Sequence, residues 1–175
     1  LCIYTPSNYI FPSKLDKYMD LTHNKGINLT QRGREQGIRR LMSINLLKRL
    51  ESSVFSFNLT LSRIRELITK TIDAINRFEK YGVKINLADM DYRTWREELQ
   101  TDADILELLT LMIADITPEY DTKLQTLFGL ISKKIEHPIN QDNKKIMIFS
   151  AFSDTAEYLY ENVSVFVKKK YGLDT

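Results

Sequence analysis

The feature that most constrains the fold is a proline-free stretch, residues 30–81, in which apolar side chains recur at spacings of three and four. Such spacing is the apolar stripe of an amphipathic helix. The stripe comprises Leu47, Leu50, Val54, Phe57, Leu61, Ile64, Ile68, Ile72 and Ile75. An unbroken helix here would measure roughly 75 Å, although Gly33 and Gly37 weaken its first turns and the sequence allows a kink at residues 51–53. The pattern predicts one very long helix, or two that are nearly collinear, with Gly82 placed as a C-terminal cap.

Two further helices are predicted to follow and to fold back along the long one. Trp95 and Leu99 begin an apolar face, and Thr101 or Asp102 is the expected N-cap of its second part. That face resumes at Ile105, Leu108, Leu109, Met112, Ile113 and Ile116. Thr117 and Pro118 suit the N-cap and first position of the next helix, whose stripe is Leu124, Leu127, Phe128, Ile131 and Ile135. Short connections favour antiparallel neighbours, so the expected fold class is mainly α, a bundle or protrusion of long amphipathic helices.

The C-terminal part changes from helical to strand patterning. Two lysines precede a short apolar run at residues 146–149, and a serine-rich turn and a further helix follow. Ser153 or Asp154 is the expected N-cap of that helix, whose apolar positions are Ala156, Leu159, Tyr160, Val163 and Phe166. A strand, a loop and a helix are half of a parallel βαβ unit, and a lone parallel strand cannot satisfy its backbone. We therefore expect this chain, which begins with Leu1, to be cut from a larger protein.

Two blocks of the sequence resemble one protein family. The first is a D-x-K-L-x-x-L helix from Asp121, a polar linker, a strand of the type K-x-x-I-F-S-x-F, and a D-T-x-x-Y-L helix from Asp154. This order resembles the start of the second RecA-like lobe of Swi/Snf-type superfamily 2 helicases, in which residues 148–152 (IFSAF) would form motif IV. The second block, residues 41–53 (LMSINLLKRLESS), resembles the helical segment between the two lobes in bacterial Swi/Snf-like helicases. The blocks occur in the family's order and cover about half of the chain.

The resemblance implies a fragment of a bacterial, cytoplasmic, DNA-dependent ATPase that couples ATP hydrolysis to translocation on duplex DNA. Residues 1–28 would be an extended N-terminal segment and linker, residues 29–138 the helical inter-lobe domain, and residues 139–175 a βα piece that starts the C-terminal RecA-like lobe. The partners would be the remaining helicase lobes and duplex DNA, reached through the parent protein. The fragment would couple the lobes and position DNA, whereas ATP and magnesium would be cofactors of the parent and not of this fragment.

Four residues are candidates for contacts with nucleic acid. Lys48 and Arg49 lie in the second block, where their cationic groups could reach phosphates. The alternative is that their stems pack beside the apolar stripe, their heads are solvated, and Glu51 pairs with Lys48 across one turn. Ser150 and Ser153 lie in the loop after the predicted strand, where α/β sheets place ligand contacts, and the resemblance implies that this loop faces the nucleic acid. The alternative for Ser153 is simple helix capping.

No catalytic or metal-binding residue is expected in the chain. It has no G-x-x-x-x-G-K-[ST] loop to hold phosphates and no Asp-Glu pair after a strand to hold magnesium. The string at residues 31–40 superficially resembles the arginine-finger motif of helicases. That motif should follow motif IV in chain order, so a solvated helix face is the favoured interpretation. His23 and His137 lie far apart, and no Cys/His spacing indicates zinc.

Composition fits this interpretation and leaves one competing function open. The formal net charge is only +2, so charge alone does not indicate nucleic-acid binding. Cys2 is the only cysteine, which fits a reducing compartment, and no apolar run reaches the ~20 residues of a membrane span. The alternative is a stand-alone helical protein–protein interaction module, which has no use for a strand at residues 145–149. Without its sheet, that strand would stay disordered, pair with Cys2–Tyr4, or form a homo-oligomer through its open edge.

Overall fold

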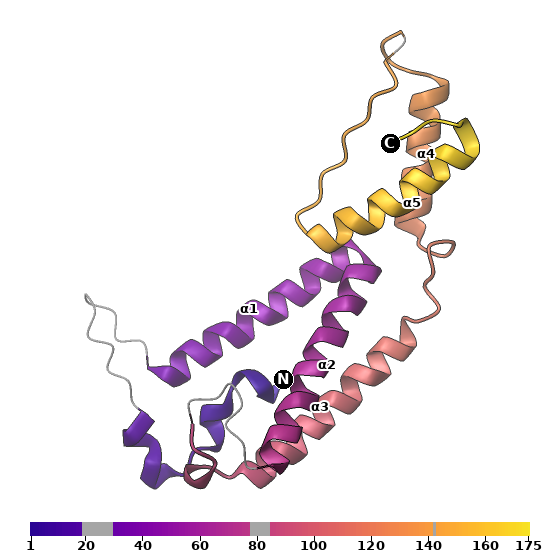
Figure 1. The fold of residues 1–175 in the computed structure, drawn as a ribbon. Coiled ribbons are helices and arrows are strands. Elements are labelled where there is room, and N and C mark those ends of the chain that lie inside the picture. Colours follow the sequence, from indigo (N-terminus) through magenta and orange to yellow (C-terminus); the bar gives the residue numbers. More distant parts are fainter. Residues whose placement is uncertain (19–29, 78–84, 142) are drawn as a thin grey trace, which may run out of the picture. The chain divides into compact units, whose positions relative to one another are not determined.

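The computed structural model describes residues 1–18, 30–77, 85–141 and 143–175. Its α-helices are α1 (Gln31–Ser52), α2 (Val54–Asn76), α3 (Tyr92–Met112), α4 (Thr122–Glu136) and α5 (Ser153–Tyr171) (Figure 1). Its 3-10 helices are η1 (Cys2–Tyr4), η2 (Pro6–Tyr9), η3 (Pro12–Tyr18) and η4 (Leu87–Asp89). The described ranges contain no sheet, only an isolated antiparallel bridge between Ile10 and Met90. The prediction of a mainly α fold is therefore confirmed, while the linker predicted just before residue 29 and the cap predicted at Gly82 lie outside the described residues.

The contacts of the chain divide it into two compact units. The first consists of Leu1–Leu47 and Thr60–Thr110, and the second of Lys48–Leu59 and Leu111–Thr175. The ends of α1 and α2 that meet near Ser53 belong to the second unit, while most of both helices belongs to the first. The predicted division at residues 28 and 138 stays a prediction.

The long apolar stripe is interrupted at Ser53, which lies between α1 and α2. Ser53 closes one helix and opens the other: its backbone N donates to the Arg49 carbonyl at 2.9 Å, and its own carbonyl accepts from Phe57 N at 3.0 Å. Ser52 and Ser53 form the kind of small polar pair at which helices bend sharply, and Figure 1 shows the chain turning there. The expected kink at residues 51–53 is confirmed, and the nearly collinear arrangement is wrong.

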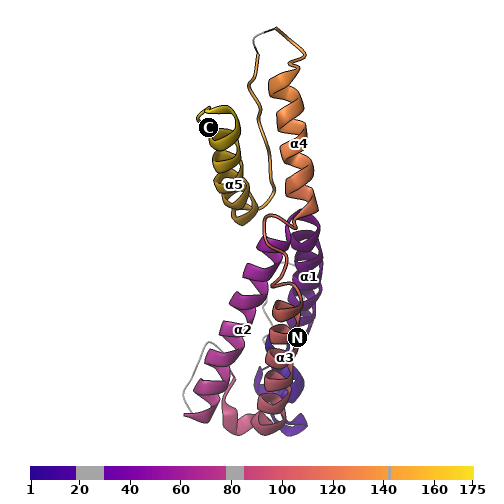
Figure 2. The same cartoon turned by 90° about the vertical axis from the view of Figure 1, so that its right-hand side faces the viewer.

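The core of the first unit is the seam between α2 and α3. From α2 it takes Leu61, Ile64, Ile68, Ile72 and Ile75, and from α3 it takes Trp95, Leu99, Ala103 and Leu106, all buried. Two polar contacts fix the direction of the seam: Arg65 pairs with Glu107 at 2.8 Å, and Arg96 donates to Asn76 at 2.7 Å. Because the later residue of α2 meets the earlier residue of α3, the helices are antiparallel, as Figure 2 shows. The predicted fold-back of this helix along the stripe is confirmed.

The face that α3 buries agrees with the prediction at Trp95 and Leu99 and differs from it beyond them. The expected stripe from Ile105 through Leu108 to Met112 is exposed. The sequence offers apolar residues on two sides of this helix, and the side that carries Trp95, the largest core residue, is the one in the core. No second start occurs at Thr101 or Asp102, because α3 runs through both as one helix.

The N-terminal segment packs on the first unit as 3-10 turns, so the expected extended start at Cys2–Tyr4 is wrong. Cys2 N donates to the Asp102 carboxylate at 2.6 Å, and the Tyr9 ring lies 6.2 Å from that of Trp95. Ser7 donates from both its backbone N and its hydroxyl to the buried Glu35 of α1, at 3.0 and 2.5 Å. These partners, all within the first unit, hold the segment in place.

In the second unit, α4 packs on α5 and not along the long stripe as predicted. Their shared core contains Ile131, Ile135 and Val167, joined by Leu127, Val163, Phe166 and Tyr171. Asp121 begins α4 by accepting from the backbone N of Lys123 and of Leu124, both at 3.0 Å. The predicted helix start at Asp121 is confirmed, whereas the predicted N-cap at Thr117, with Pro118 inside the helix, is wrong.

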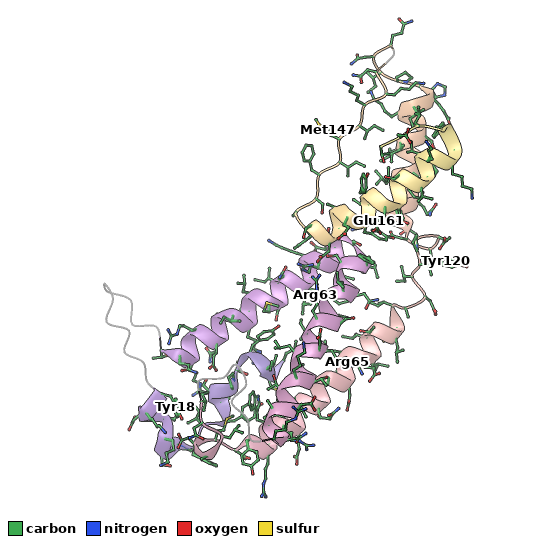
Figure 3. The ribbon with its side chains drawn as sticks, in the orientation of Figure 1. Tyr18, Arg63, Arg65, Tyr120, Met147 and Glu161 are labelled. Atoms are coloured by element: carbon green, nitrogen blue, oxygen red, sulfur yellow. The ribbon has the colours of Figure 1, made fainter. Side chains whose placement is uncertain are left out.

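The predicted strand at residues 145–149 does not form. The segment runs from α4 back to α5 without regular structure, and no backbone hydrogen bond of residues 146–149 occurs within the described ranges. The exposed fractions alternate, with 40 % for Ile146, 82 % for Met147, 42 % for Ile148 and 85 % for Phe149. Ile146 and Ile148 line an apolar groove of about 740 Å³ against α4 and α5, and Figure 3 shows Met147 pointing away from these helices. The segment is extended like a strand but has no neighbour with which to pair.

None of the helices in the described ranges combines the length and the hydropathy needed to cross a membrane.

Shortening a core side chain of α2 is predicted to destabilise the chain. Leu61→Ala should lower the free energy of unfolding by ~2–5 kcal/mol, because it removes a fully buried side chain and leaves a cavity. Denaturant unfolding followed by circular dichroism measures the change. The control is Leu67→Ala on the same helix, where the side chain is exposed and the loss should be well under ~1 kcal/mol. Equal losses in the two variants would mean that the seam between α2 and α3 is not the core.

Candidate nucleic-acid interface

The four candidate residues all lie in the second unit. Arg49 lies in the last turn of α1, with Lys48 just before it, Ser150 lies in the loop before α5, and Ser153 is the first residue of α5. The structure brings Arg49 against this loop: its guanidinium lies 4.8 Å from the centre of the Phe152 ring. The resemblance placed these segments in two separate blocks, and nothing in the sequence indicated that they would touch.

Arg49 is held by an ion pair inside the protein. Its Nη1 lies 2.6 Å from Oδ2 of Asp154 and also donates to the Ser56 hydroxyl at 3.0 Å. The side chains of Arg49 and Asp154 are only 18 % and 12 % exposed. Screening by water is weak at such a site, so the ion pair is stronger than one on the surface. The expectation that the head of Arg49 is solvated is therefore wrong.

Lys48 behaves differently from its neighbour. Its side chain is exposed, and the expected pair with Glu51 is not among the ion pairs of the described residues. Glu51 instead uses its backbone carbonyl, which accepts from the Lys123 ammonium at the start of α4. Of the two cationic candidates, Lys48 is the one whose charge faces solvent.

The N-terminus of α5 is capped differently from the prediction. Phe152 is the N-cap and makes no side-chain capping bond, so the expected caps Ser153 and Asp154 are wrong. Ser150 Oγ accepts from Phe152 N at 3.2 Å, which supports the turn before the helix. Asp154 lies in the first turn, where its negative charge interacts favourably with the helix dipole. The Asp154 carboxylate therefore supplies a negative charge at the N-terminus of α5, the position at which a helix can also bind an anion.

Further contacts join the turn at Ser53 to α5. The hydroxyls of Ser52 and Thr155 lie 3.1 Å apart, and the rings of Phe55 and Tyr158 stack at 4.8 Å between centroids. The roles of Phe152, Tyr158 and Asp154 could not be predicted from the sequence, because each contacts a residue about a hundred positions away. The only local signal was the acidic residue in the first turn of α5.

Tyr158 also links α5 and the turn at Ser53 to α4. Its hydroxyl donates to Oδ2 of Asp121 at 3.0 Å, while the other carboxylate oxygen caps α4. Burial raises the pKa of Tyr158 above its ordinary value, and the nearby Asp121 charge adds to the shift. Folding therefore favours the protonated phenol, which can donate to the carboxylate.

The polar groups at this surface were compared with those that a metal ion or a phosphate requires. No cluster of three or more His, Cys, Asp or Glu side chains suited to a metal ion occurs in the described ranges. The groups open to a nucleic-acid strand are the Lys48 ammonium and the exposed serines Ser150 and Ser153. These are phosphate-binding groups that carry no base-reading geometry of their own.

Comparison of the chain with protein-family models, with curated proteins and with solved structures found no match. The interpretation of this surface therefore depends on its residues and their geometry.

Removing the Arg49 guanidinium is predicted to loosen the second unit. Arg49→Ala should cost ~1–3 kcal/mol of unfolding free energy, because it leaves the Asp154 carboxylate partly buried without its cation. Lys168→Ala is the matched control, since the Lys168–Asp174 pair is 61 % and 85 % exposed and such pairs contribute ~0–1 kcal/mol. Thermal or denaturant unfolding distinguishes them, and a loss from Arg49→Ala no greater than that of the control would contradict a structural role.

Tyr158 is predicted to make stability depend on alkaline pH. Its pKa is raised in the folded chain, so its contribution is present below the unfolded pKa near ~10 and is lost as the pH rises above it. The unfolding free energy of Tyr158→Phe should therefore decline less steeply above pH ~10 than that of the parent chain. Tyr160→Phe, at an exposed position of the same helix, should keep the parent's decline. Identical slopes in all three proteins would show that Tyr158 is not linked to folding.

Proposed function

We propose that this chain is the inter-lobe helical segment and the beginning of the second RecA-like lobe of a Swi/Snf-like, DNA-dependent ATPase. In this role it couples the lobes and positions duplex DNA, and it performs no catalysis itself. ATP and magnesium would bind to other parts of the parent protein. The proposal starts from the resemblance of residues 41–53 and 121–159 to that family.

The observation that carries the proposal is the extended segment before α5. Its side chains are apolar in both directions, and its exposed fractions alternate with the period of two that a strand has. A strand with apolar residues on both faces is typical of a parallel sheet covered by helices on both sides. Here Ile146 and Ile148 lie against α4 and α5, whereas the alternate side chains are exposed, and residues 146–149 make no backbone hydrogen bond in the described part of the chain. This is the state expected of the first strand of a lobe whose other strands come from elsewhere.

The coding sequence around this segment gives the direct test. On the proposed function, the upstream sequence encodes a phosphate loop and an Asp-Glu motif, and the downstream sequence encodes an arginine motif. A chain extended to include them should hydrolyse ATP faster in the presence of duplex DNA. Flanking sequence without these motifs would contradict the proposal.

The 175-residue chain itself is predicted to bind duplex DNA weakly, with strong dependence on salt, because its net charge is only +2. Lys48→Ala should lower the affinity and reduce the log–log salt slope by about 1, the loss of one phosphate contact. Lys169→Ala, an exposed lysine of α5, is the control and should leave the slope unchanged. Fluorescence anisotropy at several salt concentrations provides the measurement. Tight binding that persists at ~0.2 M salt would mean an autonomous DNA site, against the proposal.

A second candidate function is a helical protein–protein interaction module. The observation that favours it is the large number of exposed apolar residues on α1 and α3, including Leu41, Leu47 and Leu108. Self-association through the open edge of residues 145–149 would also make the chain a protein–protein interaction module. Binding to a partner protein without binding to duplex DNA would favour this function over the first.

A further inference from the structure

The helix α1 presents an exposed apolar ridge within the first unit. Leu41, Ile44 and Leu47 are 66 %, 51 % and 63 % exposed, and their spacing of three aligns them along one side of the helix. Arg40 lies one turn before Ile44, and Gly37 lies one turn before Leu41, with open space around it. Residues 36–50 contain four basic residues and no acidic one. We call this side of α1, which consists of Gly37, Arg40, Leu41, Ile44 and Leu47, the α1 ridge.

The helix α3 presents an exposed apolar face in the same unit. Ile105, Leu108 and Leu109 are 49 %, 58 % and 36 % exposed and lie on the side of α3 away from its seam with α2. Asp104 lies one turn before Leu108. Among the described contacts, its carboxylate accepts a hydrogen bond from the neutral Gln100 amide at 2.9 Å and has no cationic partner. Residues 97–112 contain five acidic residues and no basic one. These residues form the α3 face.

The two surfaces match in both spacing and charge. Arg40, Leu41 and Ile44 have the same sequence intervals as Asp104, Ile105 and Leu108. If α1 and α3 lay side by side in parallel, Arg40 would face Asp104, a pair of opposite charges. Leu41 would face Ile105 and Ile44 would face Leu108, which are two apolar pairs. Such alignment of charge and apolar side chains is the usual basis of register in helix pairing.

We infer that the chain forms a homodimer in which the α1 ridge of each copy docks on the α3 face of the other. Both surfaces are exposed within one chain, so they do not cover each other, whereas a second copy supplies the missing partner to each. Figures 1 and 2 show α1 and α3 running in roughly the same direction within the first unit. A two-fold axis along that direction makes the parallel contact twice, which closes the assembly as a dimer. This inference is independent of the proposed function, because it uses neither DNA nor residues 145–149.

The test is the mass of the full 175-residue chain, measured by sedimentation equilibrium over a range of concentrations. The chain should change from monomer to dimer as concentration rises, and salt should weaken the dimer because charge pairs contribute to it. Ile44→Glu and Leu108→Glu should each raise the dissociation constant about tenfold or more. Leu130→Glu is the control, since Leu130 is similarly exposed on α4 but belongs to neither surface. Circular dichroism of each variant verifies that its helices remain folded.

A charge exchange tests the register. Arg40→Glu and Asp104→Lys should each weaken the dimer, because each places like charges opposite one another in both contacts. The double variant should recover much of the loss, since it restores opposite charges with the signs reversed. Monomers at all concentrations, or a double variant weaker than either single one, would overturn the inference. So would a dimer that survives Ile44→Glu but is abolished by Phe149→Lys, which would locate the interface at the open strand edge.

Discussion

The break at Ser53 is the constraint on which the rest of the structure depends. A single continuous helix would present the whole stripe, from Leu47 to Ile75, along one axis. The turn instead separates it, so that the α2 part is buried against α3 and the α1 part remains in solvent. The same turn positions α5 within the second unit, because Arg49 and Phe55, one on each side of the turn, contact Asp154 and Tyr158 of that helix. One short serine pair thereby decides which apolar residues form a core and which form a surface.

The Arg49–Asp154 pair changes how the candidate interface is understood. An arginine in a family-like block suggested a phosphate contact, but its guanidinium is occupied by a carboxylate, a hydroxyl and an aromatic ring. Releasing it toward a phosphate would leave Asp154 partly buried and unpaired, which is costly. Under the proposed function, Arg49 therefore holds the loop in place, and Lys48 with the serine hydroxyls is left to contact the nucleic acid.

Local patterns in the sequence were enough to predict the helices, the break near Ser53 and the start of α4 at Asp121, since each depends on residues close in the chain. They placed Trp95 and Leu99 on the buried side of α3 but were not enough to follow that side into the second half of the helix. Both the side of Trp95 and the side of Leu108 are apolar, and periodicity alone does not rank them. The ion pair of Arg49 could not be predicted for a different reason: Arg49 and Asp154 are 105 positions apart, and no local rule connects them.

The predicted strand shows a limit of another kind. Composition and flanking turns indicate a strand at residues 145–149, but a strand exists only when a neighbour accepts its backbone hydrogen bonds. In the described chain the segment keeps the side-chain alternation of a strand, with Ile146 and Ile148 inward, and lacks the pairing. An open edge of this kind invites non-specific association unless charge guards it. Lys144 and Lys145 stand immediately before the apolar run and are exposed, so they discourage unspecific stacking while leaving the edge accessible to a correctly placed strand.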